Sequence, residues 1–398
     1  MSLEVFSVVQ PHIINNLILP NLNTLDFSGI EKQFIPFIPL FLSPGITSIC
    51  LGFVSDCPKA MVASAVSSLS TLCPNLRMIN LQSLPRDPMI TVAVSGILLA
   101  INPNTLREFR ANSPLTEEAS EVVYTLPNLC QLSVYIERVT PLPSASLPNL
   151  TKLTIKCESE GGWPQLFHRA TFGKLESVAF HPQSEEIGDF LEAFERVALS
   201  SSVEKTLSSF RLSTSRSWNP NYSSLLPFTQ LTELVIESSC DNGCSSRVDD
   251  NVIVDLSRAM PKLRLLKLGD RPCRESTTGV TAKGLMALAL HCPDLWYLRI
   301  HFQVASLSAS PANTGLIRNT GPAVPWTNSS LTTLKVGGIA VPDESVLPVA
   351  LTLLHIFPRI NSIKAIKYDG EWRKVEGAIR LSRRIACCSS EHHPLTTR

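Results

Sequence analysis

The sequence has few charged and few aromatic residues for its length. Charged residues make up 17% of the 398 residues, aromatic residues make up 7%, and the formal net charge is only +1. A balance this close to zero gives no reason to expect a nucleic acid or an anionic membrane as the partner. The longest apolar stretches, Phe34–Leu42 and Met89–Ile101, fall short of the roughly 20 residues that a membrane-spanning helix needs. We therefore expect no membrane association.

The motifs of common enzyme classes are also missing. The chain has no G-x-S-x-G turn to present a hydrolase serine and no H-E-x-x-H motif to bind a catalytic zinc ion. The glycine pairs Gly161-Gly162 and Gly337-Gly338 lack the Lys and Ser of a phosphate-binding loop. We therefore expect no catalytic residue and no cofactor, and we predict that the protein is not an enzyme.

Cysteine and histidine lie close together in two segments. Cys240 and Cys244 are four residues apart, and Cys387-Cys388 precede His392-His393 near the C-terminus. A structural zinc site needs two closely spaced cysteine pairs, or one such pair with a spaced histidine pair. Neither segment meets this requirement, so we predict ordinary loop and tail residues and no bound metal.

Features of a secreted protein are lacking as well. The start of the chain, Met1–Phe6, has no positively charged region of the kind that opens a signal peptide. The eleven cysteines are an odd number, and many stand where a small buried apolar residue would fit a repeat. Both points favour a reducing compartment, so we expect an intracellular protein, either cytoplasmic or nuclear.

What the sequence does contain is an internal repeat with the pattern Leu-x-x-Leu-x-Leu, often preceded by Pro-Asn or Cys-Pro. Clear copies are LPNLNTLDF (Leu19–Phe27), LPNLTKLTI (Leu147–Ile155), MPKLRLLKL (Met260–Leu268) and CPDLWYLRI (Cys292–Ile300). The first apolar residue of each copy falls at positions 22, 46, 76, 106, 129, 150, 175, 207, 231, 263, 295, 331 and 360. The mean spacing of about 28 residues lies within the range of leucine-rich repeats.

This pattern predicts an α/β leucine-rich-repeat solenoid of about 13 repeats. The last two apolar residues of each copy alternate with polar residues, as in a short strand that is buried on one face. Consecutive parallel strands need a crossover, which is usually a helix. We therefore expect a horseshoe with parallel strands on its concave face and helices on its convex face.

Several segments between the copies have the apolar spacing of amphipathic helices. They are Ala60–Leu72, Pro88–Ile101, Thr116–Leu126, Glu186–Leu199, Asp249–Met260 and Thr281–His291. Thr116, Asp249, Asp250 and Thr281 are residue types that cap helix N-termini. The stretch Ser306–Ser330 is rich in Ser, Pro, Asn, Gly and Thr, and this composition predicts a long loop on the convex side.

We divide the chain into four parts on this basis. Residues 1–18 are an N-terminal segment or cap, and residues 19–370 are the repeat domain. Residues 371–386 are a C-terminal capping helix, because Trp372, Val375, Ile379 and Ala386 share one helical face and a solenoid must cover its last open core. The basic residues of this segment would also suit a nuclear signal or a membrane-surface helix. Residues 387–398 are a flexible tail.

Two stretches resemble a known protein family. VTAKGLMALALHCPDLWYLRI (Val280–Ile300) looks like the cysteine-containing repeat of F-box/leucine-rich-repeat proteins, and VDDNVIVDLSRAMPKLRLLKL (Val248–Leu268) is similar to it. The irregular copies with Pro-Asn-Leu starts resemble the large F-box-like family of fungi. The resemblance implies a substrate receptor of an SCF ubiquitin ligase, in which an N-terminal F-box binds the ligase adaptor and the repeats hold the substrate.

The F-box itself has no counterpart in the sequence. It would take about 40 residues beginning with a Leu-Pro-x-Glu-like phrase, and residues 1–18 are too few to contain it before the first repeat at Leu22. The chain is then either a truncated product or a repeat-only relative. We expect the chain alone not to bind the ligase adaptor, and co-purification of the two would contradict this; adaptor binding would require an F-box encoded upstream.

Charge is distributed unevenly along the chain. Residues 1–204 contain 12 Lys and Arg against 19 Asp and Glu, whereas residues 205–398 contain 23 against 15. In the last four repeats the residue between the final two apolar positions is always basic: Lys267, Arg299, Lys335 and Lys364. The repeat register predicts that these side chains form a stripe on the inner face, with Tyr297 and His301 beside Arg299 and Arg211 as a more distant member.

Two functions fit this stripe. The first is protein binding, with a partner that is acidic or phosphorylated, because charge-assisted hydrogen bonds from Arg and Lys are strong. The second is a nucleic-acid-binding solenoid that uses the basic half. The low aromatic content and the acidic first half make a nucleic acid the less favoured partner. A third interpretation, that the long side chains simply extend into water, assigns the stripe no function.

Overall fold

The computed structural model describes residues 19, 21–137, 146–158, 171–182, 190–214, 220–238, 248–269, 279–308, 330–337, 339–365 and 368–390. The predicted N-terminal segment 1–18, the glycine pair Gly161-Gly162, the cysteines Cys240 and Cys244, the loop 309–329 and the tail from residue 391 lie outside these residues. The chain divides into two compact units, Met1–Thr206 and Leu207–Arg398. The division falls close to residue 204, which separates the acidic from the basic half of the sequence.

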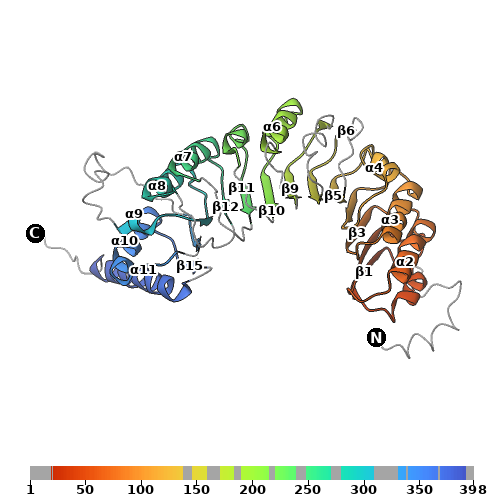
Figure 1. The fold of residues 1–398 in the computed structure, drawn as a ribbon, viewed down its shortest axis with the longest axis horizontal. Coiled ribbons are helices and arrows are strands. Elements are labelled where there is room, and N and C mark those ends of the chain that lie inside the picture. Colours follow the sequence, from red (N-terminus) through yellow and green to blue (C-terminus); the bar gives the residue numbers. More distant parts are fainter. Residues whose placement is uncertain are drawn as a thin grey trace, which may run out of the picture. The chain divides into compact units, whose positions relative to one another are not determined.

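Unit 1 is built on a parallel sheet whose strands follow one another in chain order (Figure 1). The strands are β1 (Thr24–Ile30), β2 (Ser48–Phe53), β3 (Met78–Ser83), β4 (Glu108–Ala111), β5 (Gln131–Ile136), β7 (Lys152–Cys157) and β9 (Ser177–Pro182). The crossovers contain η3 (Ile35–Phe41), α2 (Lys59–Leu72), α3 (Pro88–Ala100), α4 (Glu117–Val123), α6 (Phe190–Ser200) and η4 (Val203–Lys205). Two short strands, β6 (Ser146–Leu147) and β8 (Thr171–Phe172), form a separate parallel pair.

Unit 2 repeats this arrangement. Its parallel strands are β10 (Ser209–Thr214), β11 (Glu233–Ser238), β12 (Leu265–Leu268), β13 (Tyr297–Ile300), β14 (Thr333–Val336) and β15 (Ser362–Ala365). The helical segments are η5 (Tyr222–Leu225), α7 (Asp250–Ala259), α8 (Ala282–His291), α9 (Val304–Ser308), η6 (Asp343–Ser345), α10 (Val346–Ile356) and α11 (Asp369–Ser390). In each unit the helices lie on one side of the strands and leave the other side, the open face, uncovered (Figure 1).

The Leu-x-x-Leu-x-Leu pattern coincides with the strands. From residue 46 onward, the first apolar residue of every copy is at most 1% exposed. The second and third apolar residues lie in the strand and are buried on the helix side, which confirms the predicted alternation. Phe27 in β1 and Ala365 in β15 are exceptions, each only half-buried. These two strands are the first and the last, so each has a neighbouring strand on one side only.

The asparagine of the Pro-Asn-Leu phrase has a structural role that the sequence pattern did not reveal. The side-chain amides of Asn75, Asn128 and Asn149 donate to the backbone carbonyls of Pro44, Asn104 and Pro127, at 3.0, 2.9 and 2.9 Å. Each acceptor belongs to the turn that precedes the previous strand. A hydrogen bond of this kind satisfies a turn carbonyl, so the recurring asparagine links one copy of the repeat to the one before it.

Asp250 connects two successive helices of unit 2. Thr116, Asp249 and Thr281 cap their own helices through side-chain oxygens, as predicted. Asp250, predicted to cap α7, instead reaches the start of α8. Its Oδ1 accepts from the backbone N–H of Thr281 at 2.8 Å and of Gly284 at 2.9 Å. Its Oδ2 accepts from the Thr281 hydroxyl at 2.6 Å.

We expect Asp250→Ala to lower the free energy of unfolding of unit 2. The substitution leaves two backbone N–H groups and a hydroxyl without their acceptor, which costs about 1–3 kcal/mol. Urea denaturation of the full chain measures the loss. Asp255→Ala, on an exposed position of the same helix, serves as the matched control and should change stability by less than about 0.5 kcal/mol. Equal effects of the two substitutions would show that the Asp250 hydrogen bonds contribute nothing.

Helix α11 packs on the last strand, β15, and on α10. Its apolar residues Trp372, Val375 and Ile379 are at most 1% exposed. Glu376 accepts from the backbone N–H of Ile363 in β15 at 3.0 Å, so α11 bonds to the outer edge of that strand. A strand edge covered in this way cannot pair with another chain.

Two predicted boundaries near the C-terminus differ from the structure. Helix α11 (Asp369–Ser390) begins two residues before the predicted capping helix and continues through the first four residues of the predicted tail. No proline or glycine stands between Gly377 and Pro394 to end the helix earlier. The predicted loop Ser306–Ser330 also begins later than expected, because its first residues still belong to α9.

Candidate functional site: the open face of the second unit

Four basic residues occupy equivalent positions on four adjacent strands of unit 2. Lys267 pairs in register with Arg299, Arg299 with Lys335, and Lys335 with Lys364. We call these four residues the cation row. Their strand neighbours Leu266, Leu298 and Leu334 are fully buried on the helix side, and side chains alternate between the two faces of a strand. The cation row therefore lies on the open face, with about 4.8 Å between successive strands.

A carboxylate at one end of the cation row reduces the repulsion between its members. Glu237, at the end of β11, has its Oε1 atom 3.9 Å from Nζ of Lys267 and 3.7 Å from Nη1 of Arg299. Arg299 is only 8% exposed, and a buried cation needs a nearby opposite charge. Glu237 thus acts on two of the four basic residues at once, whereas the exposed Lys364 has no ion pair within the described part of the chain.

Tyr297 lies beside this charged group and adds an aromatic surface. The ammonium group of Lys267 lies over the Tyr297 ring, 5.4 Å from its centroid, which is the geometry of a cation–π contact. The ring of Trp296 packs edge-on against Tyr297 at 5.7 Å, and Trp296 is 46% exposed. Aromatic side chains next to basic ones are enriched in protein interfaces, so this end of the row has the composition of a binding surface.

His301 occupies a space that two glycines provide. It follows β13 directly, while Gly269 follows β12 and Gly337 follows β14. A Cβ atom at Gly337 would overlap the His301 ring, and a Cβ atom at Gly269 would lie 3.4 Å from it. Gly269 also has a positive φ of 80°, which strongly favours glycine. The sequence contained a signal for this arrangement, because both glycines stand two residues after members of the cation row.

We expect Gly337→Ala to displace the His301 imidazole. The added methyl group overlaps the ring, and overpacking of this kind typically costs about 1–3 kcal/mol. His301→Ala removes the clash, so the stability cost of Gly337→Ala should be much smaller in a chain that also carries His301→Ala. The free energies of unfolding of the two single variants and the double variant measure this coupling. A cost that is the same in both backgrounds would contradict the contact.

Arg211 lies apart from the cation row. Its register partner on β11 is Val235, which in turn pairs with Lys267. An apolar, buried residue therefore separates Arg211 from the nearest member of the row. Its guanidinium Nη2 is 2.7 Å from Oε2 of Glu233. The structure thus groups Lys267, Arg299, Lys335, Lys364, Tyr297 and His301. Arg211 lies two strands away from Lys267 and has its own ion pair.

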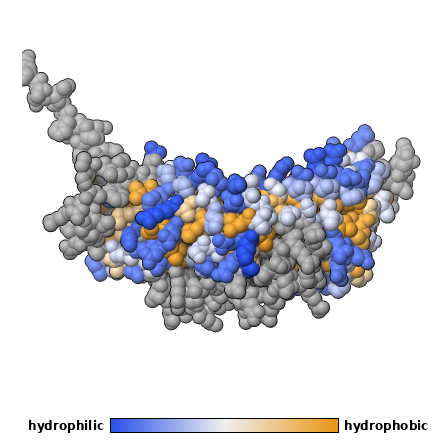
Figure 2. All heavy atoms as spheres, turned by 90° about the horizontal axis from the view of Figure 1, so that it is seen from above, coloured by the Kyte–Doolittle hydropathy of each residue, from blue (hydrophilic) through white to orange (hydrophobic). Residues whose placement is uncertain are grey.

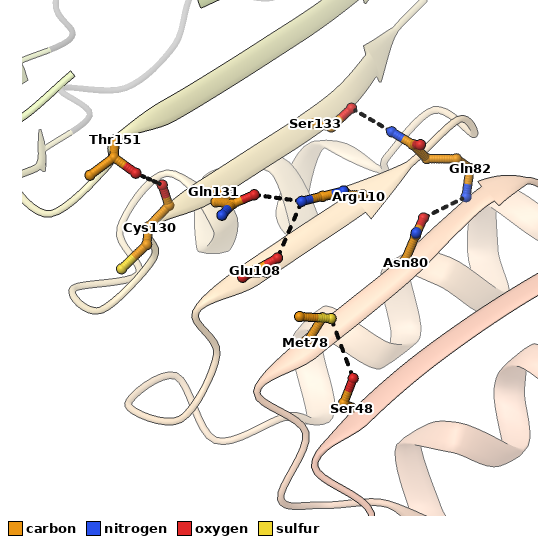
Figure 3. Close-up of polar contacts among 10 residues, drawn as sticks. All are labelled: Ser48, Met78, Asn80, Gln82, Glu108, Arg110, Cys130, Gln131, Ser133 and Thr151. Atoms are coloured by element: carbon orange, nitrogen blue, oxygen red, sulfur yellow. Dashed lines mark hydrogen bonds and ion pairs between the residues drawn. The ribbon is translucent and has the colours of Figure 1, made fainter. Parts of the chain in front are cut away.

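The open face of unit 1 has a different chemistry. Figure 3 shows Arg110 of β4 between Glu108 and Gln131, with its Nη2 atom 3.3 Å from the carboxylate and 2.5 Å from the amide oxygen. The side-chain amide of Gln82 donates to the Ser133 hydroxyl at 3.3 Å. These side chains satisfy one another within β4 and across β3 to β5. This part of the face of unit 1 is therefore polar and nearly neutral, whereas the open face of unit 2 is basic.

Three findings on the described residues concern metal ligands, two buried thiols and helix length. Over these residues, no three or more His, Cys, Asp and Glu side chains are grouped so as to hold a metal ion. Burial raises the pKa of the Cys73 thiol to about 11 and that of Cys292 to about 12, so both remain protonated at neutral pH and are poor nucleophiles. None of the described helices is both long and apolar enough to cross a bilayer.

Comparison with known proteins gives no family assignment. The chain matches no protein-family model, and no curated protein is significantly similar to it in sequence.

Proposed function

We propose that this chain is a leucine-rich-repeat module that binds another protein, and that the open face of unit 2 is its binding surface. The observation that carries the proposal is the register of the cation row. Lys267, Arg299, Lys335 and Lys364 occupy paired positions on consecutive strands. The Glu237 carboxylate approaches the row at its Lys267 and Arg299 end, at 3.9 and 3.7 Å, and Lys364 is exposed at the other end. A surface of this kind attracts a segment with negative charges.

The expected partner presents acidic or phosphorylated side chains in an extended segment. Three strand spacings give the row a length of about 14 Å, which an extended peptide of about four residues spans. Carboxylate or phosphate groups on that segment would form charge-assisted hydrogen bonds with the row. Arg299 suits bidentate contacts because of its planar guanidinium group. The half-buried Tyr297 would provide apolar contact area next to these charges.

Within this proposal, the chain acts as a substrate-recognition component of SCF-type ubiquitin ligation and has no catalytic role of its own. The similarity of Val248–Leu268 and Val280–Ile300 to F-box/leucine-rich-repeat proteins supports this part. Both stretches consist of a helix followed by a buried strand, α7 with β12 and α8 with β13. The partner held on the cation row would then be the substrate of the ligase, in the cytoplasm or the nucleus.

Binding of a nucleic acid is the alternative that a basic row also permits. The excess of basic over acidic residues in positions 205–398 favours it. The scarcity of aromatic side chains for stacking bases weighs against it, as does the acidic first half of the chain. Protein binding therefore remains the proposed function.

Affinity capture with the tagged full chain distinguishes the two functions. We expect specific capture of proteins that contain acidic or phosphorylated segments, identified by mass spectrometry, with nuclease treatment leaving the capture unchanged. Binding to random RNA should be weak and should vanish as salt is raised to about 0.2 M. Tight RNA binding at that salt concentration, together with loss of the captured proteins after nuclease treatment, would favour the alternative and contradict the proposal.

A further inference from the structure

Helix α3 of unit 1 exposes an apolar surface. None of its 13 residues is charged, although it lies on the outside of the unit. Met89 is 55% exposed, Val92 is 65% exposed and Leu99 is 48% exposed. These positions fall on one side of the helix together with Gly96, beside which an added Cβ atom would meet nothing within 4 Å. A surface helix normally places charged or polar residues on this side, so the α3 stripe (Met89, Val92, Gly96 and Leu99) requires an explanation.

A row of carboxylates lies on helix α4, which contacts α3. The neighbouring helix α4 is joined to α3 by a hydrogen bond from the backbone N–H of Thr116 to the Ser95 hydroxyl at 2.9 Å. It exposes Glu117, Glu118 and Glu121 on one side. Among the described residues these three carboxylates have no ion pair, and they lie in the unit that carries the net negative charge. A segment that covered the stripe would therefore gain from basic residues on its α4 side.

Helix α11 of unit 2 exposes a surface with the complementary composition. While Trp372, Val375 and Ile379 are buried, the opposite side of the helix carries Leu381, which is 60% exposed, and Ile385, which is 59% exposed. Arg384 stands next to Ile385 on this side. It is exposed and has no ion pair within the part of the chain that the structure describes. Apolar and basic groups thus lie side by side along the outer side of α11.

We propose that α11 of one molecule binds the α3 stripe and the α4 carboxylates of a second molecule, so that the protein self-associates head to tail. This goes beyond the proposed binding of an acidic partner, because it uses neither the cation row nor the open face. Leu381 and Ile385 would contact Val92 and Leu99, and Arg384 would face the α4 carboxylates. Burial of both apolar surfaces drives the contact, and the opposite charges orient it.

The symmetry of this contact determines the kind of assembly. Each molecule carries the two complementary surfaces once, in different units, so the contact is heterologous and not a two-fold dimer. Heterologous contacts generate closed rings or open chains. Figure 2 shows hydrophobic residues exposed among hydrophilic ones on the side of the molecule that it views. We expect a transient contact with a dissociation constant on the order of micromolar.

Sedimentation velocity of the full chain tests the proposal. We expect the weight-average mass to rise as the protein concentration increases from about 1 to about 100 µM. The rise should become smaller between about 0.1 and about 1 M NaCl, because salt screens the charged part of the contact. Val92→Lys and Leu381→Glu should each weaken association at least about tenfold, since each places a charge in the apolar contact. Both positions are exposed, so neither substitution should change the melting temperature.

A charge exchange provides the specific control. Glu118→Arg and Arg384→Glu should each weaken association, and combining them in one chain should restore it, because the two surfaces are then again oppositely charged. Glu137→Arg, an equal charge change at an exposed position just after β5, should leave association unchanged. A chain that is monomeric at about 100 µM and low salt would overturn the proposal. Association that is insensitive to Val92→Lys, or that the combined charge exchange fails to restore, would overturn it as well.

Discussion

Replacing Lys335 and Lys364 by glutamate is expected to abolish capture of the protein partner. The two substitutions turn half of the cation row acidic, so a negatively charged segment is repelled where it was attracted. We expect a loss of about 3 kcal/mol of binding free energy, which is more than a hundredfold in Kd. Quantitative capture from the same lysate, or a titration with an identified partner, measures the loss.

These two positions are preferable to Arg299 for this purpose. Arg299 is 8% exposed and lies 3.7 Å from Glu237, so Arg299→Glu would bring two carboxylates together in a largely buried place. Such a variant would lose stability as well as binding. Lys364, by contrast, is exposed, and Lys335 is half-buried. We therefore expect Lys335→Glu with Lys364→Glu to retain the wild-type melting temperature within about 2–4 °C.

A second pair of substitutions controls for the change in net charge. Arg258 in α7 and Lys283 in α8 are exposed on the helix side of the same unit. Arg258→Glu with Lys283→Glu alters the net charge equally but leaves the open face unchanged, and this variant should capture the partner like the wild type. If both double variants lose the partner to the same degree, total charge decides binding. If neither does, the cation row is not the binding surface.

Trp372→Ala is expected to cause the largest loss of stability among single substitutions in the C-terminal part of unit 2. The indole ring is fully buried and packs edge-on against Phe302 at 6.0 Å, and its Nε1 donates a hydrogen bond to the Ile339 carbonyl at 2.9 Å. Removing a buried tryptophan side chain typically costs about 3–5 kcal/mol, because a large cavity remains. Urea denaturation should show this loss, and hydrogen exchange should show that β15 and α11 open first.

Two further tryptophan substitutions separate packing from hydrogen bonding. Trp372→Phe keeps most of the ring but removes the donor to Ile339, so we expect it to cost only about 1–2 kcal/mol. Trp296→Ala acts on a ring that is 46% exposed and should change stability by less than about 0.5 kcal/mol. If Trp372→Ala were as mild as Trp296→Ala, α11 would not stabilise the end of unit 2.

The strands could be predicted from the sequence because their signal is local. Each strand has its own apolar alternation, and the first apolar residue of many copies, such as Leu263 and Leu295, follows a proline two residues earlier. The register of the cation row therefore followed from the pattern alone. The helices were predictable for the same reason. Predicted boundaries for α2, α3, α7 and α8 differ from those of the structure by one residue at most at each end.

Contacts between residues far apart in the sequence could not be predicted from the repeat pattern. Glu237 approaches Lys267 and Arg299, which lie 30 and 62 positions later in the sequence. Asp250 bonds to residues 31 and 34 positions later. The exposure of one side of α3 could not be predicted from the sequence either, because a helix without charged residues is typically buried on all sides. Nothing in the repeat pattern indicated that the chain divides at Thr206, because the copies continue across this point.

A charge exchange between the module and its partner tests the central claim most directly. Once a partner segment has been identified, its acidic residues are replaced by lysine, and binding is measured by fluorescence anisotropy with the wild-type chain and with the Lys335→Glu, Lys364→Glu variant. We predict that the lysine-substituted segment no longer binds the wild-type chain. Its affinity for the variant should be at least about tenfold higher than its affinity for the wild type. If the original segment binds the wild type and the variant with equal affinity, the cation row does not hold the partner, and the proposed function of this face is contradicted.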